Sequence, residues 1–280
     1  MATGASIGAV AMTEPGAGSD LRGLRTRAAK VDGGYLIDGS KTFITNGDRA
    51  QVIVLFATVE PTAGRDGITA FIVDGEPEGL TRGKPMKKIG LRGSSTCELF
   101  FEDCRIPATD RLGAEGAGFA LSMEAVVNSR ISAAAQGLGN AVGAYRSAMR
   151  WSLARGLLAA GRREAQAAQF RLADMRSEIA AARTLLLTTA MVVDLGAPGA
   201  ITDVSIAKLR CTELGVRISA AALELLGSDG DREEWGIERR LRDAKIAEIY
   251  DGTNEIQRML IARDNRERAH RAAEGELDTT

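Results

Sequence analysis

Near its start the chain carries Ala11-Met-Thr-Glu-Pro-Gly-Ala-Gly-Ser-Asp20, a glycine-rich turn that follows a short apolar segment. Glycine has no Cβ, so backbone N–H groups at such a turn can approach a ligand that larger residues would exclude. The Thr13 hydroxyl can donate a hydrogen bond to a ring heteroatom. A Pro-Gly-Ala-Gly segment alone indicates a plain surface turn. The functional interpretation therefore depends on the full string through Asp20 and Gly23.

A second informative stretch lies near the other end of the chain, Ile249-Tyr-Asp-Gly-Thr-Asn-Glu-Ile-Gln257. Asp-Gly is one of the commonest turn dipeptides, so Asp251 in isolation indicates only a turn. The preceding Arg242-Asp-Ala-Lys-Ile gives it a longer context. Together the two stretches resemble the flavin-binding signature and the catalytic-base loop of the acyl-CoA dehydrogenase family, in that family's order and separation. The resemblance runs from about Ile7 to Arg263.

The composition is that of a globular protein with room for two domains: 280 residues, 45% apolar and 26% charged. Lys and Arg (36) nearly balance Asp and Glu (37), so no basic excess favours nucleic acid or a membrane surface as partner. No apolar run reaches membrane-spanning length, and the first residues do not resemble a signal peptide.

Cysteine and histidine usage narrows the chemistry. Cys97, Cys104 and Cys211 form no C-x-x-C pair, which indicates reduced thiols and a cytoplasmic protein. The only histidine is His270, so Ser-His and Cys-His catalysis lack a base. No metal-ligand cluster stands out. Gly137-Leu-Gly139 lies in a predicted helix, which indicates helix packing and not a nicotinamide-binding turn.

Up to about Leu112 the chain reads as short strands separated by turns. The predicted strands are residues 25–31, 35–41, 52–57, 68–73 and 97–101. Asp32-Gly33-Gly34 joins the first two as a hairpin turn. We predict an antiparallel, barrel-like β domain over residues 1–112.

After Gly116 the apolar residues recur at spacings of three and four, the period of an amphipathic helix. Three long helices are predicted, marked by apolar residues over 127–148, 172–186 and 204–225. A fourth, shorter helix is predicted to begin with Asn254 as N-cap and Gln257 at the capping-box position. We predict a four-helix bundle over 113–266, a disordered charged tail over 267–280, and an α+β fold overall.

The predicted helix faces are rich in alanine. Alanine permits close helix approach but buries little apolar area, which stabilises by about 25 cal/mol per Å2. Such helices need partners on more than one side. We therefore expect an oligomer, a homodimer or homotetramer.

The resemblance implies FAD as cofactor. Family residues that match Val10 to Ser19 line the flavin, among them Val10, Met12, Thr13, Gly18 and Ser19, and the match of Ser19 also touches the acyl-CoA. Lys41-Thr-Phe-Ile-Thr-Asn-Gly47 resembles the family's second flavin segment, in which Phe43 packs on the ring, Ile44 adjoins it and Thr45 hydrogen-bonds it. The alternative for Phe43 is an ordinary core side chain.

The resemblance also implies that Asp251 is the catalytic base. The reaction removes a proton α to a thioester carbonyl while a hydride leaves the β carbon, and it needs a carboxylate in a site that excludes water. Burial raises the pKa of such a carboxylate and makes it a better base. The family more often has Glu here, and a misplacement of about 1 Å can cost about a hundredfold in rate. Some relatives place the base at the position of Ser129, which cannot take that role.

Further contacts follow from the same resemblance. Arg130 matches a residue near the CoA moiety, and its alternative is a solvated or ion-paired arginine. Tyr250 and Gly252 are implied to contact the substrate, and Thr253 and Glu255 the flavin.

In the family, a neighbouring subunit grips the flavin nucleotide. Its Arg-Lys-x-Phe-Gly string corresponds here to Arg155-Gly-Leu-Leu-Ala159, which retains only Arg155. Its Gln-x-x-Gly-Gly-x-Gly string corresponds to Glu224-Leu-Leu-Gly-Ser-Asp-Gly230, which retains Gly227 and is followed by Asp231. Glu224 and Asp231, which stand where the family has uncharged residues, add like-charge repulsion toward a pyrophosphate. Gln166 matches a family flavin contact.

Family members carry a large helical domain before the Thr-Glu-Pro-Gly motif, so this chain resembles the middle and C-terminal domains alone. Three functions stay open. The chain is an FAD-dependent acyl-CoA dehydrogenase that passes electrons to an electron-transfer flavoprotein or another acceptor. It is a non-catalytic homologue or subunit of a hetero-oligomer whose other chain supplies the helical domain. Or it is a related flavoprotein oxidase with a non-CoA substrate, for which Asp is also a permissible base.

Overall fold

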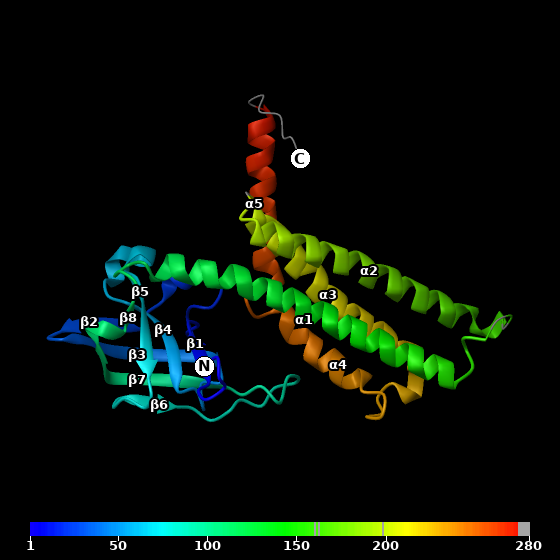
Figure 1. Ribbon diagram of the computed structural model, residues 1–280, viewed down its shortest axis with the longest axis horizontal. Coiled ribbons are helices and arrows are strands. Elements are labelled where there is room, and N and C mark those ends of the chain that lie inside the picture. Colours follow the sequence, from blue (N-terminus) through cyan, green and yellow to red (C-terminus); the bar gives the residue numbers. More distant parts are fainter. Residues whose placement is uncertain (160, 162, 198, 274–280) are drawn as a thin grey trace. The chain divides into compact units, whose positions relative to one another are not determined.

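The structure is a computed structural model that describes residues 1–159, 161, 163–197 and 199–273 (Figure 1). The chain divides into two compact units, Met1–Ala125 and Val126–Thr280. Strands are the main regular secondary structure of the first unit and helices that of the second, so the predicted α+β class is confirmed.

The first unit is built on one open, mixed sheet. Its strands are β1 (Gly8–Ala11), β2 (Arg27–Val31), β3 (Gly34–Thr45), β4 (Val52–Thr58), β5 (Ile68–Asp74), β6 (Leu80–Arg82), β7 (Thr96–Pro107) and β8 (Arg111–Leu112). Their order is β6-β7-β3-β2-β4-β5-β8, with β1 beside β4. The predicted barrel-like antiparallel domain is wrong in two respects: the sheet does not close, and both β1 and β2 pair with β4 in parallel. Periodicity along one strand contains no information about the direction of its partner.

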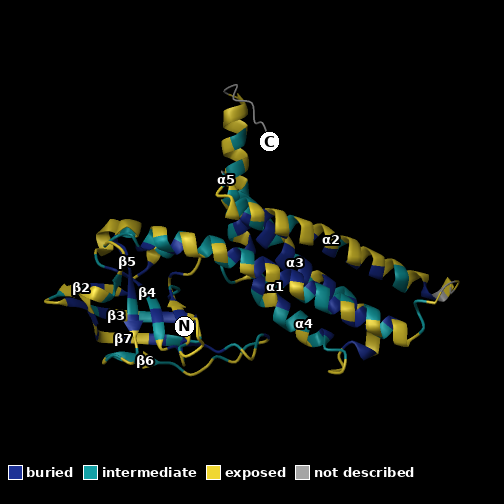
Figure 2. Cartoon of the chain, viewed as in Figure 1, coloured by how far each residue is buried: buried dark blue, intermediate teal, exposed yellow. Residues whose placement is uncertain are grey.

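β3 and β7 are longer than predicted because their pairing continues through two irregularities. The register shifts between Ile37 and Gly39 and again between Lys41 and Ile44. Each shift breaks the alternation of apolar and polar residues, so the sequence pattern ends where the strand does not. Buried residues, dark blue in Figure 2, make up the middle of this sheet and form its core.

The start of α1 (Gly118–Ala154) belongs to the first unit. Phe119 and Leu121 pack against a cluster that includes Phe56 and Ile68. The two units therefore divide after Ala125, inside α1, whereas the sequence places the change at residue 112. The reason is that α1 supplies apolar residues to both cores.

The second unit contains the three long helices predicted, α1, α2 (Gln166–Asp194) and α3 (Ala200–Leu226). It also contains α4 (Ile237–Ala244), which was not predicted because its short, charged sequence buries only Ile237 and Ala244, one at each end of the helix. α3 contacts α2, α4 and α5 (Asn254–Ala273), and α5 leaves the bundle steeply (Figure 1). Within the described residues, no helix combines the length and hydropathy needed to cross a membrane.

Glycine allows α1 and α3 to approach closely. A Cβ on Gly137 would lie 2.5 Å from the Cys211 carbonyl oxygen, and one on Gly215 would lie 2.7 Å from the Gly137 carbonyl oxygen. The packing role predicted for Gly137 is therefore confirmed. Alanines such as Ala134 and Ala141 continue this contact as buried core residues.

α5 continues through residues that the sequence assigns to a disordered tail. Residues 267–273 are helical, and ion pairs Arg263–Glu267 and Asp264–Arg268 join successive turns at i,i+4 spacing. The rest of the predicted tail, 274–280, lies outside the described residues.

Candidate active site

The glycine-rich turn of the first unit is closed by two backbone hydrogen bonds between Glu14 and Ala17. Gly18 and Ser19 are exposed beyond it, and Thr13 and Met12 are half-buried before it. Val10, at 54% exposure, projects from β1 on the same stretch. The residues implied to line a flavin are therefore accessible, apart from those that anchor the turn.

A buried ion pair connects this turn to β3. The Lys41 ammonium lies 2.8 Å from Glu14 Oε1, and the two side chains are 0% and 6% exposed. Lys41 also donates to the Met12 carbonyl at 3.1 Å, and the Thr42 N–H donates to the Thr13 carbonyl at 2.9 Å. The structure thus brings together the two segments that the sequence assigns to the flavin.

Electrostatics reflect the burial of this pair. Burial lowers the pKa of Lys41 to about 8, opposed by the charge of Glu14. Burial raises the pKa of Glu14, but the charge and hydrogen bond of Lys41, together with hydrogen bonds from Thr26 and Arg25, outweigh it, so the pKa is lowered overall. Sequence reasoning missed the pair, although Lys41 follows Tyr35 and Ile37 at even spacing and so falls on the buried face of its strand.

Phe43 occupies the bulge between Lys41 and Ile44 with a left-handed φ of 57°. Its ring is 66% exposed, so the alternative of an ordinary core side chain is wrong. A bulky residue in the left-handed region is costly, and such strain concentrates at functional sites. Thr45 is exposed nearby, whereas the Ile44 side chain is 2% exposed in the core and can offer a ligand only its backbone.

These first-unit residues fit a flavin ring. An exposed aromatic face, a half-buried Thr13 hydroxyl and glycine-rich backbone lie on segments held together by the buried Glu14–Lys41 pair. Exposed apolar Val10 adds surface that a planar apolar ligand would cover.

In the second unit, Asp251 lies in a tight loop before α5. Asp251 and Gly252 both have left-handed backbones, with φ of 55° and 87°. A Cβ on Gly252 would lie 2.9 Å from Gln257 Nε2 and 3.3 Å from Arg130 Nη2, so this position requires glycine. Asp is among the few other residues that adopt this conformation readily, a local reason for Asp where the family more often has Glu.

Arg130 holds this loop from α1. It is 8% exposed, and its Nε donates to the Asp251 carbonyl oxygen at 3.2 Å. It is therefore neither solvated nor confined to an ion pair, the alternatives considered from sequence. Burial lowers the pKa of Arg130, opposed by the charge of Asp251.

The pKa of the Asp251 carboxyl is raised, first by burial. A hydrogen bond from Ser129 and the positive charges of Lys208 and Arg130 oppose the rise. Ser129, which cannot act as a base, thus contributes to the environment of the residue that can.

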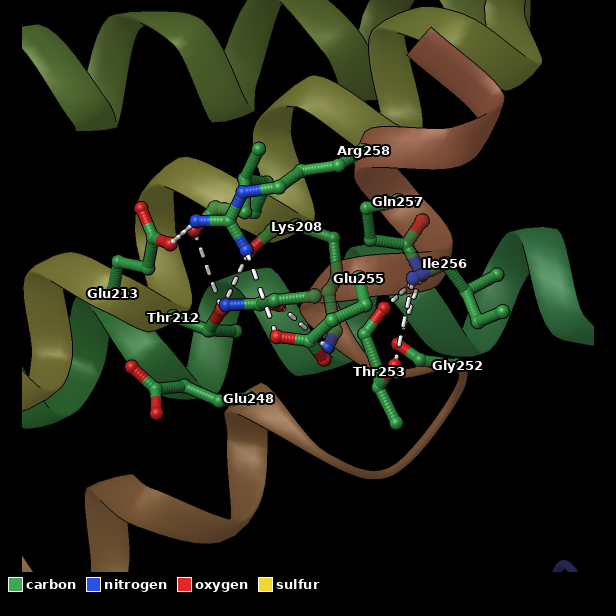
Figure 3. Close-up of polar contacts among 12 residues, drawn as sticks. Lys208, Thr212, Glu213, Glu248, Gly252, Thr253, Glu255, Ile256, Gln257 and Arg258 are labelled. Atoms are coloured by element: carbon green, nitrogen blue, oxygen red, sulfur yellow. Dashed lines mark hydrogen bonds and ion pairs between the residues drawn. The ribbon is translucent and has the colours of Figure 1, made fainter. Parts of the chain in front are cut away.

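Lys208 on α3 is a second buried cation that the sequence analysis missed. It is 0% exposed, and its ammonium donates to Asn254 Oδ1 at 3.0 Å (Figure 3). The signal was present: Lys208 falls four residues after Val204, on the apolar stripe of its helix. Asn254 is therefore not the N-cap predicted, since its side chain points to Lys208 and the Ile256 N–H is 3.4 Å from the Thr253 hydroxyl.

The remaining residues of the loop and of the start of α5 differ in how far they are buried. Tyr250 is half-buried and its hydroxyl donates to Gln136, another residue that sequence reasoning missed; burial raises the pKa of Tyr250 to about 12. Gln257 is fully buried and its amide donates to the Gly252 carbonyl at 2.8 Å, so it is a donor and not the capping-box acceptor. Glu255 is exposed and Thr253 half-buried.

The residues that the resemblance assigns to the flavin nucleotide of a neighbouring subunit form contacts within this chain instead. Arg155 hydrogen-bonds Asp229, and the Trp151 indole N–H donates to the same carboxylate at 2.8 Å. Gly227 ends α3 with a φ of 56°, and Gln166 is exposed at the start of α2. The Asp229 carboxylate thus shares the one retained arginine and adds a negative charge that would repel a pyrophosphate. It lies roughly 35 Å from Arg130 along α1, at 1.5 Å per residue.

Comparison with known proteins gives consistent matches for both units. Residues 9–104 match the family model described as acyl-CoA dehydrogenase, middle domain, and residues 116–265 match acyl-CoA dehydrogenase, C-terminal domain. The short-chain specific acyl-CoA dehydrogenase of Megasphaera elsdenii is 41% identical over 92% of this chain and 67% of its own length.

Two solved structures extend the comparison. Butyryl-CoA dehydrogenase from Megasphaera elsdenii superposes with a TM-score of 0.87 at 40% identity, over 92% of this chain and 68% of the other. PigA with FAD and proline superposes with a TM-score of 0.89 at 30% identity, over 95% and 69%. The chain thus spans about two thirds of the proteins that it matches.

Proposed function

The chain belongs to the acyl-CoA dehydrogenase family, and from that premise we propose that it dehydrogenates an acyl-CoA thioester between the α and β carbons. The cofactor is FAD, which when bound accepts the hydride from the β carbon. The activity is that of a flavoprotein oxidoreductase of fatty acid metabolism.

Asp251 takes the α proton onto its carboxylate. The single observation that carries this proposal is the environment of that carboxyl group: a half-buried loop with a left-handed backbone, in which burial raises the pKa and makes the carboxylate a stronger base. Arg130 holds the loop through the Asp251 carbonyl, and Tyr250 and Gly252 flank the base. A backbone fixed in this way directs the short side chain with little rotational freedom.

In the first unit, Thr13, Phe43 and Thr45 hold and orient the flavin, and Ser19 meets the acyl-CoA. The Glu14–Lys41 pair keeps their two segments together. The remaining candidate contacts, Val10, Met12, Gly18 and the Ile44 backbone, exclude water from the same face.

The proposal extends to the acyl chain, the electron acceptor, the compartment and the oligomeric state. A short acyl chain is favoured because two relatives are named as short-chain specific and butyryl-CoA enzymes. An electron-transfer flavoprotein or similar acceptor consumes the electrons. Free, buried cysteines favour a reducing compartment, the cytoplasm. An oligomer is favoured by the apolar side chains exposed on α2.

The test is the visible absorption spectrum of the purified chain after FAD is added and unbound cofactor is removed. A retained flavin band that acyl-CoA bleaches anaerobically in the wild type, and not in Asp251→Asn, supports the proposal. A retained band that reoxidises rapidly in air with release of hydrogen peroxide indicates the oxidase. No retained band indicates a non-catalytic subunit, and the Arg155–Asp229 pair is then the first reason to examine.

A further inference from the structure

The loop that carries Asp251 is held at its C-terminal end by a buried polar cluster (Figure 3). Asn254 is 4% exposed and stands three residues after Asp251. Its Oδ1 accepts a hydrogen bond from Lys208 at 3.0 Å, and the Thr212 hydroxyl lies 3.2 Å from the same oxygen. Lys208 and Thr212 are one turn apart on α3, so a regular helix fixes the position of the loop's end.

Charged groups on four surrounding segments act electrostatically on the ammonium group of Lys208. The negative charges of Asp251 on the loop, Glu248 on η6 (Lys245–Glu248) and Glu255 on α5 favour its protonated form, and the positive charge of Arg130 on α1 opposes it. Among the described residues no carboxylate forms an ion pair with it, and its hydrogen-bond acceptor is a neutral amide. Burial lowers the pKa of Lys208 to about 8, opposed by the charge of Asp251, so it is mostly protonated at neutral pH.

Packing alone does not explain a lysine at this position. The buried residues one turn before and one turn after it on α3 are Val204 and Thr212, and a methionine of similar length would fill the same space without burying a charge. A buried cation without an ion-pair partner costs stability, and it also lowers the pKa of the Asp251 carboxyl. Lys208 therefore lowers the stability of the fold and at the same time favours the ionised form of Asp251.

We propose that Lys208 is a positioning residue for Asp251: it fixes the Asp251–Asn254 loop through the Asn254 side chain and places a positive charge beside the Asp251 carboxylate. The proposal rests on the proposed function, in which Asp251 is the base. It adds Lys208 and Asn254 to the residues on which proton abstraction depends.

The experiment compares the wild type with Lys208→Met, Lys208→Arg and Asn254→Ala, all loaded with FAD. In Lys208→Met the acid limb of kcat/KM for butyryl-CoA should move to higher pH by about one unit, because a positive charge that favoured the carboxylate is gone. Lys208→Arg should restore the acid limb. Asn254→Ala keeps the charge, so it should leave the limb in place while residues 249–254 exchange their amide hydrogens faster.

Arg210→Met is the matched control, since it removes an exposed cation from the same helix. It should change neither the acid limb nor the exchange of the loop. Lys208→Gln replaces Lys208→Met if the latter does not fold.

A readout independent of turnover separates this proposal from the proposed function. The titration of Asp251 is followed by carbon NMR in protein with labelled aspartate, and its signal is assigned by loss in Asp251→Asn. An upward shift in Lys208→Met supports the positioning role even if the wild type oxidises no acyl-CoA. An unshifted titration and unchanged loop exchange overturn it, including the case in which Lys208→Met only lowers the melting temperature.

Discussion

At the scale of the residue, Asp251 combines a left-handed backbone with a partly buried carboxyl group whose pKa is raised, a combination found in no other carboxylate that the structure describes. Its φ of 55° favours Asp over Glu, and its carboxyl group is half-buried between Ser129, Arg130 and Lys208. A Glu would extend the base by one methylene but would adopt the left-handed backbone conformation at a higher free-energy cost. The shorter base is therefore what this loop conformation accommodates best.

The raised pKa of Asp251 predicts opposite effects on activity and stability. Because the folded-state pKa lies above the unfolded one, the stabilising contribution is full at low pH and is lost as pH rises through the folded pKa. Asp251→Asn lacks this loss, so at pH 7 it should melt at a higher temperature than the wild type. Asn also tolerates the left-handed backbone.

Activity should follow the ionised form. Flavin bleaching by acyl-CoA should fall as pH drops through a value above the ordinary Asp range, and Asp251→Asn should lose about 10²- to 10⁴-fold in rate. Melting curves and anaerobic stopped-flow traces across pH measure both effects. A variant less stable than the wild type at pH 7 would contradict the assignment of burial as the dominant influence.

At the scale of the element, the β3 bulge presents Phe43 at the cost of a strained backbone. The bulge interrupts pairing with β7, while the buried Glu14–Lys41 pair holds the same point of β3 to the glycine-rich turn. The strand is therefore irregular where it is most firmly anchored, an arrangement typical of a binding element.

Phe43→Gly should separate strain from binding. Glycine adopts a positive φ without strain, so the protein without cofactor should gain about 1 kcal/mol in the free energy of unfolding. Loss of the ring should weaken FAD binding about tenfold, measured by flavin fluorescence titration. Asp103→Gly is the control, because Asp103 has a similar φ of 48° on β7; it should bind FAD as the wild type does and change stability little, since Asp adopts this conformation readily. Unchanged FAD affinity in Phe43→Gly would remove Phe43 from the site.

At the scale of the whole molecule, apolar side chains remain exposed on the second unit. Phe170, Leu187 and Met191 on α2 are 61%, 60% and 64% exposed, and Leu195 just beyond it is 80% exposed. Leu187 and Met191 lie one turn apart and form a stripe. Such a surface agrees with the oligomer expected from the alanine-rich helices.

Light scattering after size-exclusion chromatography should therefore give a mass above that of the 29.6 kDa chain. Leu187→Glu combined with Met191→Glu should shift the mass to the monomer, because two charges would be buried in the contact. Arg210→Glu changes the net charge by the same amount at an exposed position and should leave the mass unaltered. A wild-type monomer at micromolar concentration would reject the expectation.

The sequence by itself determined the α+β class, the three long helices, most of the strands and the two segments of the flavin and base motifs. These follow from local periodicity and from residue strings that are readable without neighbours. The openness of the sheet, the parallel β1, α4 and the true N-cap at Thr253 were decided by tertiary structure, because each depends on a partner distant in the chain.

The site divides in the same way. Asp251, Phe43 and the glycine-rich turn could be named from their motifs, whereas Lys41, Lys208 and Gln136 could not, since a lysine or glutamine at an apolar position acquires meaning only from what it meets. Burial removes Lys41 and Lys208 from water although both side chains carry a charge. The loop between Tyr250 and Asn254 is held by hydrogen bonds from Arg130 on α1 and Lys208 on α3, and these contacts create the environment of the base. The local sequence determines which side chains are present. Packing determines their orientation, their protonation state and their pKa, because solvation is a property of the whole fold.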